Sequence, residues 1–231
     1  IIVAADDCVQ SSILGYSDRG KFDKDNMPST FQWWLEQYQR EIDYAIKNGL
    51  SNTTTIQQFA TSVAPLLGNI SWDQGDPYNI LCPTLTNSSG KSERTVTGCV
   101  ATATAQVMRY YKWPQKGTGS NSYTWENGGK TLSMDFSKST YDWNNMTETY
   151  SGTSTTTQKN AVAKLMYDCG ISCNMDYGLS ETGGSGASAF DQVAGLYNHF
   201  GYDQEMEHLT RNYYKLAEWN AIIINEINNK R

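Results

Sequence analysis

The sequence contains no long apolar run, no basic cluster and only two histidines among its 231 residues. Its longest apolar stretches, such as 1–5 and 221–224, are far shorter than the roughly 20 residues that a membrane-spanning helix needs. Eighteen Lys and Arg residues against 24 Asp and Glu residues give a net charge of −6. Because this charge repels phosphate groups, we expect neither nucleic acid nor a membrane surface as a partner.

Cysteine is also scarce, and its number is odd. The five cysteines are Cys8, Cys82, Cys99, Cys169 and Cys173. An odd number in a chain of this length does not indicate a disulfide framework. We expect Gly170 to end a helix between Cys169 and Cys173, and core packing or a local disulfide both remain open for this pair. Neither histidine lies at zinc-site spacing from them, so no metal is expected.

The remaining composition is that of a globular protein with two parts. With 39% apolar and 12% aromatic residues, the chain can bury a sizeable core. Residues 1–16 have the pattern of a β-hairpin, and Ser29 or Thr30 can cap an amphipathic helix that Gly49 ends. The polar stretch 49–58 is the best linker candidate, so we place a boundary near residue 57.

The second part alternates between helical and irregular patterns. Apolar periodicity predicts helices over 99–111, 158–168, 188–200 and 215–229. Between the first two, 118–157 is rich in Ser, Thr, Asn and Tyr, with strand-like pieces "KTLSMDF" and "TYDWNNM". Pro114 prevents the first helix from continuing. The side chains of this helix expected to be available for burial are Val100, Ala103, Val107, Met108 and Tyr111.

Cys99 stands directly after Gly98, at the expected start of a helix. Unsatisfied backbone N–H groups and the positive end of the helix dipole favour a thiolate at such a position. Gly98 has no side chain to shield the sulfur, which suits a nucleophile. Cysteine is also among the most buried residue types, however. The residues alone therefore leave two readings open, a reactive thiol and a small core side chain.

Other candidate groups carry weaker signals. Gln74, in "SWDQGDPYN", can stabilise an oxyanion if it lies beside a nucleophile, and is otherwise a solvated loop residue. His199, at the end of an expected helix, and His208, among charged residues, lack the pattern of a catalytic base. The glycine-rich loop 182–186 lacks the context of a nucleotide site. We expect it to form a mobile rim beside a substrate site.

Several stretches together resemble one known family. "TGCVATATAQVMRYYKWP" is similar to the active-site segment of the streptopain family of bacterial secreted cysteine peptidases. "WDQGDPYNILCP", "YDWNNMTETYSG", "GISCNMDYG" and "HFGYDQ" resemble further family segments in the same order. "IIVAADDCVQSSILGYSDRGKFD" resembles the end of the family's inhibitory pro-domain. The resemblance thus covers nearly the whole chain.

The resemblance implies a secreted zymogen of α+β architecture. Residues 1–57 would be the C-terminal part of the inhibitory pro-domain, with a linker, and residues 58–231 the N-terminal portion of a papain-like catalytic domain. Cys99 would be the nucleophile and Gln74 the oxyanion donor, beside the backbone N–H of Cys99. Peptides or proteins would be the substrates, with room for an apolar residue just before the scissile one. The pro-domain would be an internal partner, and no cofactor or metal would be required.

The sequence departs from the family pattern at the catalytic histidine. The family carries it in a "GGHAF"-like strand followed by an "NWGWGG"-like loop, and neither occurs in residues 1–231. His199 and His208 both precede the place where that segment would begin. We therefore expect the histidine beyond Arg231, on a C-terminal fragment retained as a separate chain. The alternative is a catalytically incomplete, self-inhibited fragment that acts only as a binding or inhibitory module, and a related acyl-transfer enzyme ranks below both.

Overall fold

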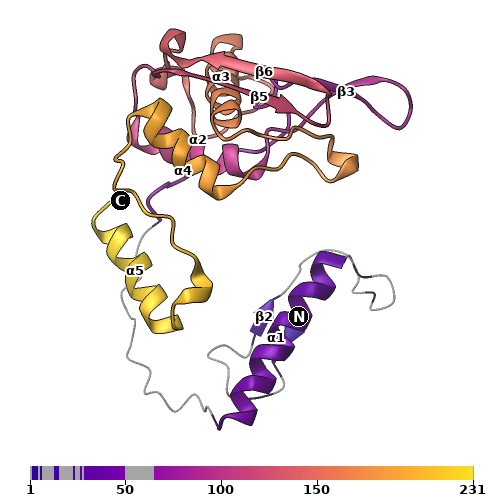
Figure 1. Ribbon diagram of the computed structural model, residues 1–231, viewed down its shortest axis with the longest axis vertical. Helices are drawn as coiled ribbons and strands as arrows, with labels where there is room; N and C mark the ends of the chain where they lie inside the picture. The colour runs from indigo at the N-terminus through magenta and orange to yellow at the C-terminus, as the bar shows by residue number, and fades with distance from the viewer. Residues whose placement is uncertain are drawn as a thin grey trace. The chain divides into compact units, whose positions relative to one another are not determined.

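The computed structural model of the chain describes residues 2–4, 6, 13–15, 23, 27, 29–49 and 65–230 (Figure 1). It divides into two compact units, Ile1–Ser62 and Val63–Arg231. The boundary predicted near residue 57, like Cys8, lies outside the described residues. The division into 1–57 and 58–231 therefore stays a prediction.

The first unit contains a short antiparallel pair of strands and one helix. Strand β1 (Ile2–Val3) pairs with β2 (Ile13–Gly15), and α1 spans Ser29–Lys47. A Cβ added at Gly15 would lie 3.6 Å from the Trp34 ring, so the end of β2 lies close to α1. Trp34 in turn stacks on Phe31, with ring centroids 5.7 Å apart. These contacts give the predicted hairpin and helix a common apolar surface.

The second unit is a mixed α and β structure. Its strands and α-helices are β3 (Thr84–Thr86), β4 (Ser92–Arg94), α2 (Cys99–Tyr111), β5 (Ser120–Trp125), β6 (Lys130–Asp135), α3 (Thr156–Ser172), α4 (Ala189–Phe200) and α5 (Leu216–Asn228). Its 3-10 helices are η1 (Phe136–Lys138), η2 (Trp143–Asn145), η3 (Ser180–Thr182) and η4 (Arg211–Tyr213). Strands β3 and β4 form one antiparallel hairpin, and β5 and β6 form another. None of the helices in the described part of the chain is both long and apolar enough to cross a membrane.

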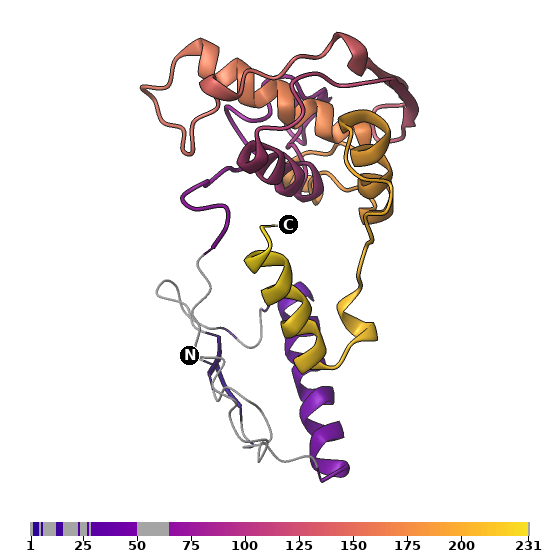
Figure 2. The ribbon, with the colours of Figure 1, turned by 90° about the vertical axis from the view of Figure 1, so that its left-hand side faces the viewer.

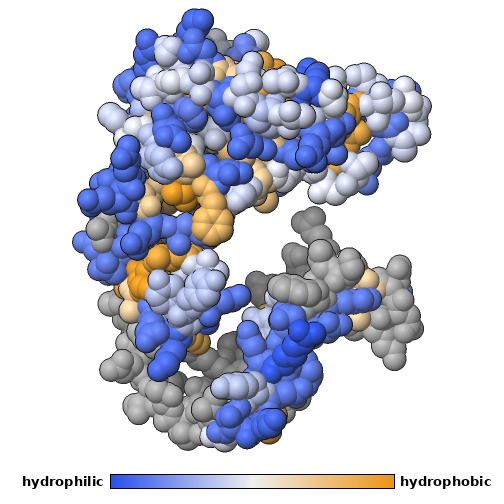
Figure 3. All heavy atoms as spheres, in the orientation of Figure 1, coloured by the Kyte–Doolittle hydropathy of each residue, from blue (hydrophilic) through white to orange (hydrophobic). Residues whose placement is uncertain are grey.

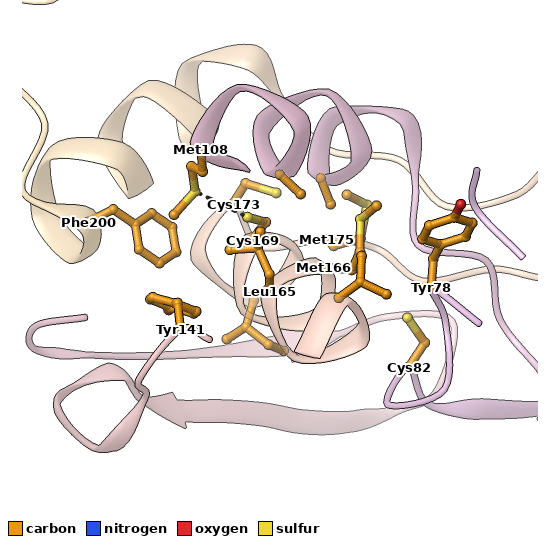
Figure 4. Packing of buried hydrophobic residues seen from close by; sticks show 14 of the residues in the cluster. Tyr78, Cys82, Met108, Tyr141, Leu165, Met166, Cys169, Cys173, Met175 and Phe200 are labelled. Carbon is orange, nitrogen blue, oxygen red and sulfur yellow. Dashed lines mark hydrogen bonds between the residues drawn. The ribbon is translucent and has the colours of Figure 1, made fainter. Parts of the chain in front are cut away.

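Helix α3 lies at the centre of this unit. It contacts α2 and α4 and also the β5–β6 hairpin (Figures 1 and 2). The buried side chains between these elements include Met108 of α2, Leu165 and Cys169 of α3, and Phe200 of α4 (Figure 4). Cys169 Sγ lies 3.5 Å from Met108 Sδ across the α2–α3 contact. In contrast, the visible face over β5 and β6 is largely hydrophilic (Figure 3).

The structure corrects the prediction that Gly170 ends a helix. Helix α3 continues through Gly170 to Ser172, and Cys173 follows as its C-cap. A Cβ at Gly170 would lie only 2.0 Å from the hydroxyl oxygen of Tyr177, which is fully buried. Glycine is therefore needed here for close packing rather than as a helix stop. Cys169 and Cys173 are both free and buried, so the core-packing alternative describes them.

Candidate active site

The first helical residue of α2 is Cys99, and its side chain is exposed. Gly98, just before it, has φ 87°. A Cβ at Gly98 would lie 2.6 Å from Met175 Sδ, so both the backbone conformation and the space require glycine. No side chain caps the N-terminus of α2, so no capping side chain occupies the first N–H groups of the helix, where Cys99 lies.

The other described cysteines are buried, unlike Cys99. Burial raises the pKa of Cys82 and of Cys173 to about 12. Burial also raises the pKa of Cys169 well above its ordinary value. These three thiols stay protonated and covered near neutral pH, so Cys99 alone among the described cysteines is accessible to a substrate.

Backbone hydrogen bonds bring Gln74 to the segment that precedes Cys99. The Thr97 N–H donates to the Gln74 carbonyl at 3.0 Å. The Gln74 N–H itself donates to Asp73 Oδ1 at 2.6 Å, which shapes the turn locally. The side chain of Asn79, on the same loop, donates to the Thr95 carbonyl at 3.0 Å in a buried position. Two separate segments, 73–79 and 95–99, thus form one site that contains both sequence candidates.

The glycine-rich loop, taken as residues 176–186 around the glycine-rich stretch 182–186, lies on another side of the same segment. The Val96 N–H donates to the Gly178 carbonyl at 3.1 Å, and Ser185 Oγ donates to the Val96 carbonyl at 2.6 Å. Asp176 and Gly186 exchange two backbone bonds, of 2.8 and 3.1 Å, which close the base of the loop. The loop that we expected to be a mobile rim is therefore tied to the segment that precedes Cys99. Sequence reasoning missed Ser185 because a serine among glycines carries no signal of its partner.

Both histidines have contacts away from this site. His199 Nδ1 lies 3.1 Å from the Thr118 carbonyl, and its ring stacks on Phe136 with centroids 4.4 Å apart. The His208 ring lies against Phe190, with centroids 4.8 Å apart. Within the described residues, no hydrogen bond or ring contact links either imidazole to Cys99. Nor do three or more His, Cys, Asp or Glu side chains of this part of the chain form a group able to hold a metal ion.

Sequence comparisons place the chain in a family. The model of the peptidase C10 family matches residues 72–231, and that of the Spi protease inhibitor matches residues 1–42. The chain belongs to the peptidase C10 family, and the resemblance to streptopain is confirmed. It is 34% identical to streptopain of Streptococcus pyogenes over 240 residues, which cover 98% of this chain and 59% of streptopain. It is 31% identical to the thiol protease/hemagglutinin PrtT of Porphyromonas gingivalis over 246 residues, which cover all of this chain and 27% of PrtT.

Solved structures give the same result for the fold. The chain is similar to a Prevotella intermedia prointerpain A fragment, with TM-score 0.74 and 37% identity over 97% of this chain and 70% of the other. It is also similar to active wild-type interpain A cysteine protease of the same organism, with TM-score 0.64 and 41% identity over 74% of this chain and 68% of the other. The predicted α+β, papain-like fold is thereby confirmed. The chain spans about three fifths of the length of the streptopain it matches.

Proposed function

We propose that this chain is part of a secreted cysteine endopeptidase with Cys99 as nucleophile and Gln74 as oxyanion donor. The observation that carries the proposal is an exposed thiol at the uncapped N-terminus of α2, with the Gln74 backbone bonded to the segment before it. Membership of the peptidase C10 family and the likeness to named cysteine proteases support this chemistry.

The proposed reaction is acyl transfer through a thioester. An imidazole takes the proton of the Cys99 thiol, Cys99 Sγ bonds to the carbonyl carbon of the scissile peptide, and the carbonyl π electrons move onto oxygen. The Gln74 side-chain amide and the Cys99 N–H donate to that oxyanion. The C–N bond then breaks, and the amine leaves with a proton from an imidazolium. Water attacks the thioester while the imidazole takes a proton from that water. The C–S bond then breaks, the sulfur regains a proton from the imidazolium, and the free acid and the thiol are released.

The imidazole in this mechanism comes from outside residues 1–231. Two observations support this part of the proposal: His199 and His208 contact Thr118, Phe136 and Phe190 rather than the Cys99 segment, and the family's histidine segment is not found in the sequence. The residues described here would thus provide the nucleophile and the oxyanion donors. A second segment would provide the acid-base group.

The N-terminal unit has a separate proposed role. The Spi protease inhibitor model matches residues 1–42, which supports residues 1–57 acting as the C-terminal part of an inhibitory pro-domain. The same match favours the second candidate function, a catalytically incomplete chain that only binds or inhibits. Rapid hydrolysis of casein by residues 1–231 with no second polypeptide present would exclude that second function.

Stoichiometric alkylation tests the main proposal. In the enzyme with its histidine-bearing segment present and Cys8 replaced by Ser, iodoacetamide at neutral pH should modify Cys99 once per molecule. The other described thiols are buried and protonated, so they should not react. Hydrolysis of casein should fall in proportion to the modification of Cys99. Peptide mass spectrometry locates the modified residue. Inactivation that leaves Cys99 unmodified, or full modification with hydrolysis intact, contradicts the proposal.

Gln74→Ala should lower kcat about 10²–10³-fold with little change in KM, since the side-chain amide acts mainly on the charge that develops in the transition state. Steady-state kinetics on a chromogenic peptide measure the effect. Gln115→Ala is the matched control, because Gln115 is exposed and its side chain makes no hydrogen bond with another described residue. A loss of less than threefold in Gln74→Ala removes Gln74 from the mechanism.

A further inference from the structure

We propose that Ser185 is a positioning residue, whose hydroxyl fixes the backbone turn that carries Cys99. This inference rests on the proposed function and deepens it. Ser185 lies in the glycine-rich loop, 89 residues from Val96 in the sequence. Its hydroxyl joins the two segments by donating to the Val96 carbonyl at 2.6 Å and accepting from the Gly178 N–H at 2.9 Å.

Val96 is held on both of its backbone groups by the same loop. Its N–H donates to the Gly178 carbonyl at 3.1 Å, while its carbonyl accepts from Ser185 Oγ at 2.6 Å. Only the second of these bonds depends on a side chain. The side chain of Ser185 therefore controls one of two attachments between the glycine-rich loop and the nucleophile segment.

Hydrogen bonds also restrict the backbone between Val96 and Cys99. The Thr97 N–H is bonded to the Gln74 carbonyl, and the Gly98 carbonyl accepts from both the N–H and the hydroxyl of Thr102, at 3.0 and 2.9 Å. Gly98 itself lies against Met175, where a Cβ would be 2.6 Å from sulfur. A shift at Val96 therefore passes along a short, tightly held segment to the Cys99 N–H. A misplacement of about 1 Å is enough to cost a large part of a reaction rate.

The loop does not need Ser185 for its own closure. Its base is held by the two backbone bonds between Asp176 and Gly186, and its turn by the bond from the Gly184 N–H to the Leu179 carbonyl at 2.9 Å. Replacing Ser185 removes the link to Val96 and the bonds of its hydroxyl with Gly178, but leaves these backbone bonds in place. The loop therefore keeps the backbone bonds that close it when the hydroxyl is lost.

The experiment compares three variants in the enzyme with its histidine-bearing segment present. Ser185→Ala and Ser185→Gly should each lower kcat about 10- to 100-fold, with KM within threefold of the parent and native thermal stability. Amide exchange at Val96 and Thr97, followed by mass spectrometry, should become faster in both. Thr182→Val is the control, because Thr182 Oγ1 donates to the Leu179 carbonyl within the turn of the same loop, at 3.1 Å, and kcat should not change.

Three results would overturn the inference. The first is an unchanged kcat in a folded Ser185 variant. The second is a rise in KM alone, which would assign Ser185 to substrate binding, and the third is an equal loss of kcat in Thr182→Val, which would indicate general weakening of the loop. If Ser185→Ala does not fold, Ser185→Gly decides the question, since it lacks the hydroxyl without adding contacts. Peptide hydrolysis by a Cys99→Ala variant tests the proposed function independently of Ser185. If that variant still hydrolyses the peptide, the proposed function is wrong, regardless of the results for the Ser185 variants.

Discussion

Replacing Cys99 by alanine is expected to lower kcat for peptide hydrolysis by about 10⁴–10⁶-fold, because no other described group replaces the bond that its sulfur forms. The fold should remain intact. Cys99 is exposed, its side chain makes no hydrogen bond with another described residue, and alanine is favourable in a helix. Hydrolysis of a chromogenic peptide and thermal unfolding, measured on the same preparation, check the two halves of this expectation.

The matched control for this variant is Cys8→Ser, which removes a thiol that has no role in the proposed mechanism. It should hydrolyse the peptide at the parental rate and still be alkylated at Cys99. Activity of Cys99→Ala within tenfold of the parent, or a Cys8→Ser variant as inactive as Cys99→Ala, would contradict the assignment of the nucleophile. Loss of activity together with loss of the thermal transition in Cys99→Ala would instead show that Cys99 is needed for folding.

Local sequence signals were sufficient for the helix that carries Cys99. The predicted range 99–111 is the observed range of α2, because Gly98 and Pro114 restrict the backbone at either end. The buried face was predicted less well. Ala103, Val107 and Tyr111 are exposed, whereas the buried residues of this helix are Ala101, Thr102, Thr104, Ala105 and Met108. Small residues, including two threonines, allow α2 to approach its neighbours closely, and an apolarity scale does not detect this.

Long-range contacts account for the other differences. Helix α3 continues through Gly170, where the Tyr177 hydroxyl occupies the space that a Cβ would need. Glycine stands there for this contact, and nothing in "DCGISC" shows it. The stretch "TYDWNNM" was expected to be strand-like but contains η2, where Trp143 is buried and its ring N–H donates to the Pro114 carbonyl at 3.0 Å. Tertiary contacts of this kind override local preference.

The difference between local sequence signals and long-range contacts also applies to the candidate site. The resemblance supplied Cys99 and Gln74 as candidates, and the structure adds that the bond from Thr97 to Gln74 joins their segments. The attachment of Val96 to Ser185 and Gly178 was not predictable, because its partners are far apart in sequence and are small residues without a motif. The proposed roles of Cys99 and Gln74 thus came from the resemblance, whereas the contacts that hold the backbone before Cys99 required the fold.

An ion pair in the core gives the second large expected effect. Asp168 is fully buried on α3, and its carboxylate oxygens accept from Lys164 Nζ at 2.9 and 2.6 Å and from the Tyr141 hydroxyl at 2.9 Å. Lys164 Nζ also donates to Ser139 Oγ at 2.6 Å. Burial, and next the nearby Asp168 carboxylate, raise the pKa of Tyr141, so its hydroxyl stays protonated and donates. The network joins α3 to the segment that follows β6.

Asp168→Ala should therefore lower the free energy of unfolding by about 3–5 kcal/mol, because it leaves a partly buried ammonium and a buried hydroxyl without their acceptor. Urea unfolding followed by tryptophan fluorescence measures the change, with the slope compared between variants. The control is Asp135→Ala, which breaks an exposed pair with Lys138 at 3.0 Å and two exposed hydrogen bonds from Ser137, and should change stability less.

A double variant tests whether the ion pair or the hydrogen bonds dominate at Asp168. If the penalty comes from the uncompensated ammonium, the double variant Lys164→Met with Asp168→Leu should recover much of the stability lost in Asp168→Ala, since an apolar pair of similar volume removes both charges together. A double variant no more stable than Asp168→Ala would show that the hydrogen bonds of Tyr141 and Ser139, rather than the ion pair, hold α3 in place. Equal stability of Asp168→Ala and the parent would contradict the whole account of this network.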